Sequence, residues 1–84
     1  MNRSDWYHGS NFTINTESYS NLIFNHTSNG GAAETYMTFT YNTGSTRQYS
    51  ESNILAGTYN ITEVQEISFQ SFNTGGWGFS ISLQ

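Results

Sequence analysis

Hydrophobic and polar residues alternate one by one along much of this sequence, which is the pattern of a β-strand with one buried face. The clearest stretches are residues 35–41 and 77–83. Their apolar faces carry Met37, Phe39 and Tyr41 in the first stretch, and Trp77, Phe79, Ile81 and Leu83 in the second. No stretch has the i, i+3, i+4 spacing of an amphipathic helix. The chain is therefore constrained to an all-β fold.

Shorter segments of the same kind are separated by clusters of Asn, Gly and Ser, which favour turns. We predict turns at 17–20, 29–31 and at Gly57, a hairpin connection at 42–45, and a β-bulge at Phe72. The remaining strands are expected at 12–15, 22–24, 46–50 at a sheet edge, 58–61 and 67–69. Together these segments predict a small antiparallel β-sandwich, or a short barrel, of about seven strands without substantial helix. Residues 1–84 are expected to form a single domain.

The charged residues exclude several classes of partner. The net charge is −4, and the only basic residues other than histidine are Arg3 and Arg47. Nucleic acids bind through several Lys or Arg contacts to phosphates, so we expect no nucleic-acid partner. The sequence has no Cys, and His8 and His26 are its only imidazoles, which leaves no zinc-type ligand set. No apolar run is long enough for a transmembrane segment.

Few residues in this sequence are able to carry out catalysis. The pair Glu63 and Glu66 is the best carboxylate candidate, and it fits either a solvated turn or, as a lower expectation, calcium ligation by hard oxygen ligands. No nucleophile elbow and no glycine-rich phosphate loop is present. We therefore predict a protein that is not an enzyme and needs no cofactor.

Neutral amides, hydroxyls and aromatic rings remain as the ligand-binding groups, and these suit the hydroxyl groups and apolar faces of sugars. We predict ligand-binding roles for Trp6, Tyr7, Asn73 and Trp77. The alternative for Trp77 is that it caps the core, because it is in phase with Phe79. A second polar and aromatic surface is expected from Tyr36, Thr38, Thr40, Gln48 and Tyr49.

Two short segments resemble parts of known families. Residues 55–59, Leu-Ala-Gly-Thr-Tyr, resemble the Leu-x-Gly-x-Tyr turn and strand of many extracellular β-sandwich modules. Residues 12–15 followed by Leu22 are similar to the opening of small β-sandwich cytolysins. Neither resemblance transfers a functional residue to this chain.

These observations lead to three hypotheses of function. The first is a carbohydrate-binding, lectin-like homo-oligomer whose partner is a neutral glycan or cell-surface ligand. The second is a self-assembling structural subunit of an extracellular filament, coat or appendage, consistent with the absence of Pro. The third is a membrane-active toxin subunit. We expect an extracellular or cell-surface protein, although the first residues of this chain have no apolar core of a signal peptide.

Overall fold

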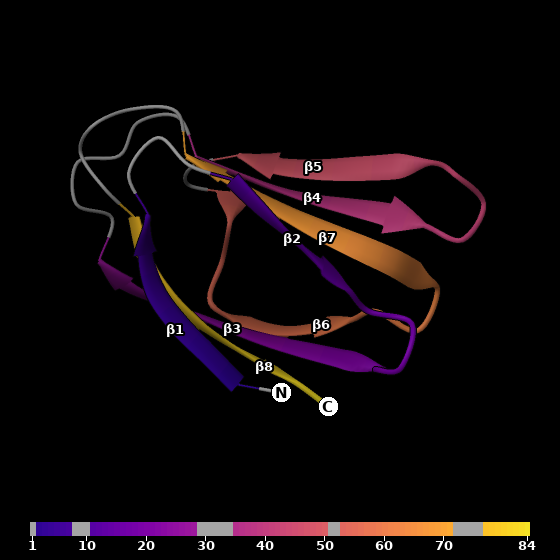
Figure 1. Ribbon diagram of the computed structural model, residues 1–84, viewed down its shortest axis with the longest axis horizontal. Helices are drawn as coiled ribbons and strands as arrows, with labels where there is room; N and C mark the ends of the chain where they lie inside the picture. Colours follow the sequence, from indigo (N-terminus) through magenta and orange to yellow (C-terminus); the bar gives the residue numbers. More distant parts are fainter. Residues whose placement is uncertain (1, 8–10, 29–34, 51–52, 72–76) are drawn as a thin grey trace.

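The computed structural model describes the backbone of residues 2–7, 11–28, 35–50, 53–71 and 77–84, and the side chains of 12–25, 35–50, 53–71 and 78–84. These residues form eight strands in two four-stranded sheets (Figure 1). The strands are β1 (Asn2–Tyr7), β2 (Asn11–Asn15), β3 (Asn21–Ser28), β4 (Thr35–Tyr41), β5 (Thr46–Ser50), β6 (Gly57–Asn60), β7 (Val64–Ser71) and β8 (Trp77–Leu83).

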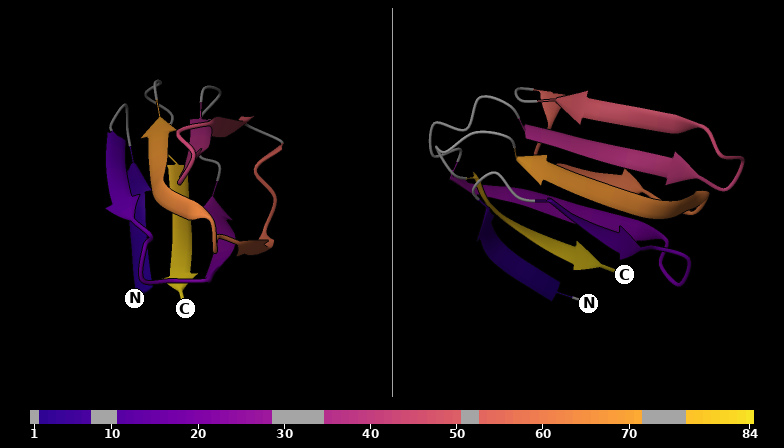
Figure 2. Two further views of the ribbon diagram at one scale, coloured as in Figure 1. Left: turned by 90° about the vertical axis from the view of Figure 1, so that its right-hand side faces the viewer. Right: turned by 45° about the horizontal axis from the view of Figure 1, so that its top comes forward.

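The strand order shows how the chain is wound. One sheet has the order β1-β8-β3-β6 and the other β2-β7-β4-β5, and every pairing is antiparallel. The first half of the chain therefore pairs with the second half, as β1 with β8, β2 with β7, β3 with β6 and β4 with β5. This is a long antiparallel ribbon rolled into two layers, the arrangement of a jelly roll. The β4–β5 hairpin is the tip of the ribbon (Figures 1 and 2).

The inner faces of the two sheets supply one apolar core. Alternate residues of β4 and β7 are buried, as the period-2 pattern predicts. At the centre Phe69 stacks on Phe12 and Phe79 with ring centroids 4.9 Å apart in both pairs. Phe24 joins them, 5.4 Å from Phe79. The buried hydrophobic residues are Ile14, Leu22, Phe24, Met37, Phe39, Ile54, Ile61, Val64, Ile67, Phe69, Phe79, Ile81 and Leu83.

Most of the predicted elements are confirmed, with two differences. The predicted sandwich had about seven strands, and the eighth is β1, whose sequence has no clear alternation. The turn predicted at 29–31 and the bulge predicted at Phe72 lie outside the described residues. A described irregularity lies instead in the β4–β7 ladder, where Thr40 pairs with Glu66 but Tyr41 pairs with Val64, so that Gln65 is an extra residue. Hydrogen bonds from the buried Thr16 hold this irregularity in place. The alternation pattern does not predict it, because Thr16 is far from Gln65 in the sequence.

Tyr59 forms a tyrosine corner, in which a tyrosine hydroxyl bonds to the backbone a few residues upstream. Its hydroxyl donates to the carbonyl oxygen of Leu55 at 2.5 Å and accepts from the Leu55 N–H at 3.1 Å. Gly57, with a φ of 149°, lies between these two residues, in the range that favours glycine. The Leu-x-Gly-x-Tyr segment thus fixes the entry of the chain into β6.

We expect Tyr59→Phe to lower the free energy of unfolding by about 1–2 kcal/mol, because two hydrogen bonds to the backbone are lost and the ring is kept. For a domain of this size that lowers the melting temperature by about 4 °C or more. Thermal unfolding followed by circular dichroism measures the change. Tyr19→Phe is the matched control, since Tyr19 also packs partly against the core. An equal loss in both variants would contradict the corner.

The pH dependence of the stability difference between the wild type and Tyr59→Phe provides a second test. Burial is the main cause that raises the pKa of Tyr59; the hydrogen bond with the Leu55 backbone partly opposes the rise, and the neighbouring Tyr49 adds a smaller one. A raised pKa means that the fold favours the neutral phenol. This stabilisation is complete below the ordinary tyrosine pKa of about 10 and is lost as the pH rises through the folded value. The stability gap between the wild type and Tyr59→Phe should therefore be constant near neutrality and narrow in alkali.

Candidate functional site

The β4–β5 connection lies at residues 42–45, as the sequence predicts, and a hydrogen bond between Tyr41 and Ser45 closes it around three loop residues. The N–H of Tyr41 donates to the carbonyl oxygen of Ser45 at 2.8 Å, and the N–H of Gly44 donates to the carbonyl oxygen of Tyr41 at 2.9 Å. Gly44 has a φ of 90°, which glycine adopts without strain. This is the turn followed by a left-handed residue that is common in three-residue hairpins. It presents the exposed side chains of Asn42, Thr43 and Ser45 at the tip of the ribbon.

A second turn, between β6 and β7, lies against the first. The N–H of Val64 donates to the carbonyl oxygen of Ile61 at 3.0 Å, and the Asn60 amide oxygen accepts from the Thr62 N–H at 2.9 Å. The two turns are joined directly, because the Asn42 N–H donates to the carbonyl oxygen of Glu63 at 2.9 Å. Residues far apart in sequence are thus held at a fixed spacing.

Tyr41 stands between the two turns, at the irregular position of the β4–β7 ladder. Bulges turn side chains and are frequent beside binding sites. Here Thr16 secures the bulge: its N–H donates to the carbonyl oxygen of Gln65 at 3.1 Å, and its hydroxyl donates to that of Val64 at 2.7 Å. Tyr41 packs partly against the core and is half-buried. One part of the ring is therefore held by the core while the remainder is open to a ligand.

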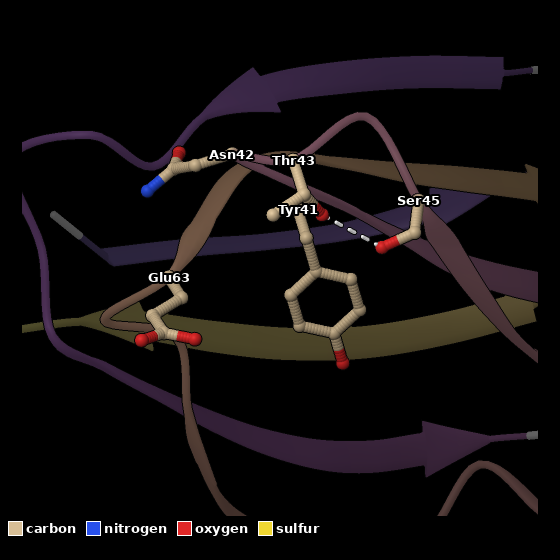
Figure 3. Close-up of a pocket in the computed structure, with 5 residues that line it drawn as sticks. All are labelled: Tyr41, Asn42, Thr43, Ser45 and Glu63. Carbon is tan, nitrogen blue, oxygen red and sulfur yellow. Dashed lines mark hydrogen bonds between the residues drawn. The ribbon is translucent and has the colours of Figure 1, made fainter.

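Two open depressions meet at this ring. The first has a volume of about 450 Å³ and is lined by Tyr41, Asn42, Thr43, Ser45 and Glu63 (Figure 3). The second, of about 430 Å³, is lined by Tyr41, Asn60, Thr62 and Glu63. Both volumes fall within the range of about 300–1,000 Å³ that is usual for small-molecule sites. The pair of depressions, called the Tyr41 site below, lies at the end of the sandwich where the β2–β3, β4–β5 and β6–β7 turns gather (Figure 1).

The chemistry of the Tyr41 site is that of neutral, hydroxyl-rich ligands. The Thr43 and Ser45 hydroxyls are 2.9 Å apart and hydrogen-bonded, so each is oriented before a ligand arrives. In the view of Figure 3 the Tyr41 ring lies between the Glu63 carboxylate and the Ser45 hydroxyl. Glu63 is the only charged residue among those described that line either depression. The site therefore offers an aromatic face, amides, hydroxyls and one acceptor carboxylate.

Three of the four ligand-binding residues predicted from the sequence, Trp6, Tyr7 and Trp77, lie elsewhere. Trp6 pairs with Gly78 and Tyr7 with Trp77 in the β1–β8 ladder, so three of the four are brought together on adjacent strands. Their side chains are not among those described, and Asn73 lies outside the described residues altogether. The end of β1 and the start of β8 are at the opposite end of the sandwich from the Tyr41 site (Figure 1).

The second predicted surface is confirmed for β4 and wrong for Tyr49. Tyr36, Thr38 and Thr40 lie on the outer face and are half-buried, and the Gln48 side-chain amide donates to the Thr38 hydroxyl at 3.5 Å. Tyr49 pairs with Met37 and so takes the inner face. Its ring packs edge-on against Phe39 and Tyr59, and Arg47 lies 4.8 Å over it. Tyr49 therefore closes the side of the core between β5 and β6.

The two carboxylates considered for calcium are positioned differently. Glu63 lies in the β6–β7 turn, whereas Glu66 lies beyond the bulge and pairs with Thr40 on one side and Asn15 on the other. Among the described residues no group of three or more His, Asp or Glu is placed to hold a metal ion. Calcium ligation stays a prediction that this part of the chain does not support further.

Of the residues that line the Tyr41 site, the sequence singles out only Glu63. The alternation pattern places Tyr41 on the buried face of its strand, and residues 42–45 predict only a connection. The available signal was that Asn-Thr-Gly-Ser directly follows an aromatic strand end. Its juxtaposition with residues 60–63 depends on sheet topology, which alternation does not determine.

No family model and no curated protein matches this chain. Among the described residues, no helix is long and apolar enough to cross a membrane.

Proposed function

We propose that this protein is a non-enzymatic, lectin-like module that binds a neutral glycan at the Tyr41 site. The observation that carries this proposal is a half-buried aromatic ring flanked by two depressions whose other lining groups are amides, hydroxyls and one carboxylate. An aromatic ring packs on the apolar face of a pyranose, and amide and hydroxyl groups pair with its hydroxyls. Binding as a homo-oligomer would strengthen a weak individual site through avidity.

The preorganisation of the site supports the proposal. The cross-link from Asn42 to Glu63, the hydrogen-bonded pair of hydroxyls on Thr43 and Ser45, and the fixed Asn60 amide all exist in the free protein. Groups that are already ordered lose little conformational entropy when a ligand binds. The jelly-roll fold itself occurs in lectins and in capsid proteins, so the fold alone does not select the function.

Charge defines which glycans fit. The Glu63 carboxylate accepts hydrogen bonds from sugar hydroxyls, and it repels a sugar carboxylate in the same depression. The net charge of −4 acts in the same direction. Neutral sugars are therefore favoured over uronic acids and other anionic sugars.

We expect glucose, galactose or N-acetylglucosamine to bind more tightly than the corresponding uronic acid, by about fivefold or more for a close pair of like charges. Isothermal titration calorimetry at low ionic strength measures both affinities. Glu63→Gln should remove most of the discrimination, because the amide keeps an acceptor oxygen without the charge. Glu66→Gln is the matched control, with the same charge change on the outer face, and should leave the preference intact. Equal affinity for both sugar classes in the wild type would contradict this role of Glu63.

One observation favours a second candidate function, that of a self-assembling subunit. Strand β5 is an edge of its sheet, and among the described residues no strand pairs with its other side. This edge has no Pro, so its backbone is able to pair with a strand from another copy, while the charge of Arg47 opposes that pairing. Open-ended growth of the solution mass with concentration, measured by light scattering and insensitive to every sugar, would support assembly over glycan binding.

A further inference from the structure

Resting on the proposed function, we infer that the Tyr41 site takes two consecutive units of one linear neutral oligosaccharide, one in each depression. The two depressions are nearly equal, about 450 and 430 Å³, and share Tyr41 and Glu63. Because they share two lining residues they are neighbours, and a ligand that filled both would pass along Tyr41. A single sugar ring would fill only one depression, and the other would stay filled with water.

Each depression has polar groups of its own. The first adds Asn42, Thr43 and Ser45 to the shared pair, and the second adds Asn60 and Thr62. In the second, the Asn60 amide oxygen is held by the Thr62 N–H at 2.9 Å, which fixes the orientation of the amide. Both depressions are therefore supplied with groups for a separate sugar unit. The first is the richer, so a monosaccharide is expected to occupy it.

The spacing of the two subsites is fixed by the backbone. The hydrogen bond from the Asn42 N–H to the Glu63 carbonyl oxygen joins the turn beneath the first depression to the turn beneath the second. The bulge at Gln65, held by Thr16, sets the position of Tyr41 between them. A second unit that is covalently linked to the first adds contacts without a second loss of translational freedom. Disaccharides should therefore bind more tightly than their component monosaccharides.

The test compares maltose, cellobiose, lactose and N,N′-diacetylchitobiose with glucose, galactose and N-acetylglucosamine, by isothermal titration calorimetry. For the tightest disaccharide we expect an affinity at least about tenfold above that of its monosaccharide. Thr62→Ala should lower the disaccharide affinity several-fold more than it lowers the monosaccharide affinity. Thr43→Ala, in the first depression, should lower both. Both side chains are exposed, and a thermal melt checks that each variant folds.

The outcomes separate this inference from the proposed function. If sugars bind but the disaccharide is no tighter than its monosaccharide, or if Thr62→Ala affects both ligands equally or neither, the two-unit inference fails and the single-site function stands. If the wild type binds none of these sugars, the proposed function fails and the inference fails with it.

Discussion

Phe69→Ala is expected to destabilise the protein strongly. Phe69 is 1% exposed, and its ring stacks on Phe12, Phe24 and Phe79 at centroid distances of 4.9, 6.3 and 4.9 Å. Truncating a buried phenylalanine costs about 3–5 kcal/mol. The total stability expected for 84 residues is about 4–13 kcal/mol, at roughly 0.05–0.15 kcal/mol per residue. The loss is therefore a large part of the whole.

Urea and thermal unfolding followed by circular dichroism measure this loss. The melting temperature should fall by about 12 °C or more if a transition remains visible. Leu55→Ala is the control: it also shortens a large apolar side chain, but Leu55 is 64% exposed, so the change should stay within about 0.5 kcal/mol. Similar costs for the two variants would mean that the stacked phenylalanines do not form the central core.

Tyr41→Ala is expected to weaken glycan binding by at least about tenfold, which corresponds to about 1.4 kcal/mol. The substitution removes the aromatic face that both depressions share. It also removes part of the packing at the end of the core, because the ring lies against the buried cluster. A moderate loss of stability is thus expected along with the loss of binding.

Two further variants separate these effects. Tyr41→Phe keeps the ring and should retain most of the affinity. Tyr36→Ala removes a tyrosine of the same strand from its outer face, and should leave binding unchanged. Calorimetric titration with the tightest disaccharide, at a temperature where all variants are folded, gives the comparison. Full affinity in Tyr41→Ala would place the glycan elsewhere on the protein.

The alternation of hydrophobic residues was sufficient to predict the fold class and most strands. Met37 and Phe39 on β4, and Phe79 and Ile81 on β8, are buried as expected. Alternation indicates which residues of a strand share a face, but it does not determine how that strand pairs with its neighbours. Tyr49 shows this limit: the polar strand 46–50 was predicted correctly as an edge, but the register that places Tyr49 beside Met37 comes from pairing with β4.

The Tyr41 site was harder to predict because it is a product of topology. Its residues come from two turns that are close only after the ribbon has rolled into two sheets. The bulge that sets Tyr41 depends on hydrogen bonds from Thr16, which lies in the separate turn after β2. The ligand-binding residues predicted from the sequence, Trp6, Tyr7, Asn73 and Trp77, suit a binding site by residue type, but their side chains are not among those described.

The measurement that tests the central claim most directly is the mapping of backbone amide shifts by NMR during titration with the tightest neutral disaccharide. A site at the end of the sandwich with the β4–β5 and β6–β7 turns predicts the largest shifts at residues 41–45 and 60–63. Residues of the β1–β8 ladder, including Trp6 and Trp77, should change little. Shifts centred on Trp6, Tyr7 and Trp77 would contradict the Tyr41 site and favour the residues predicted from the sequence.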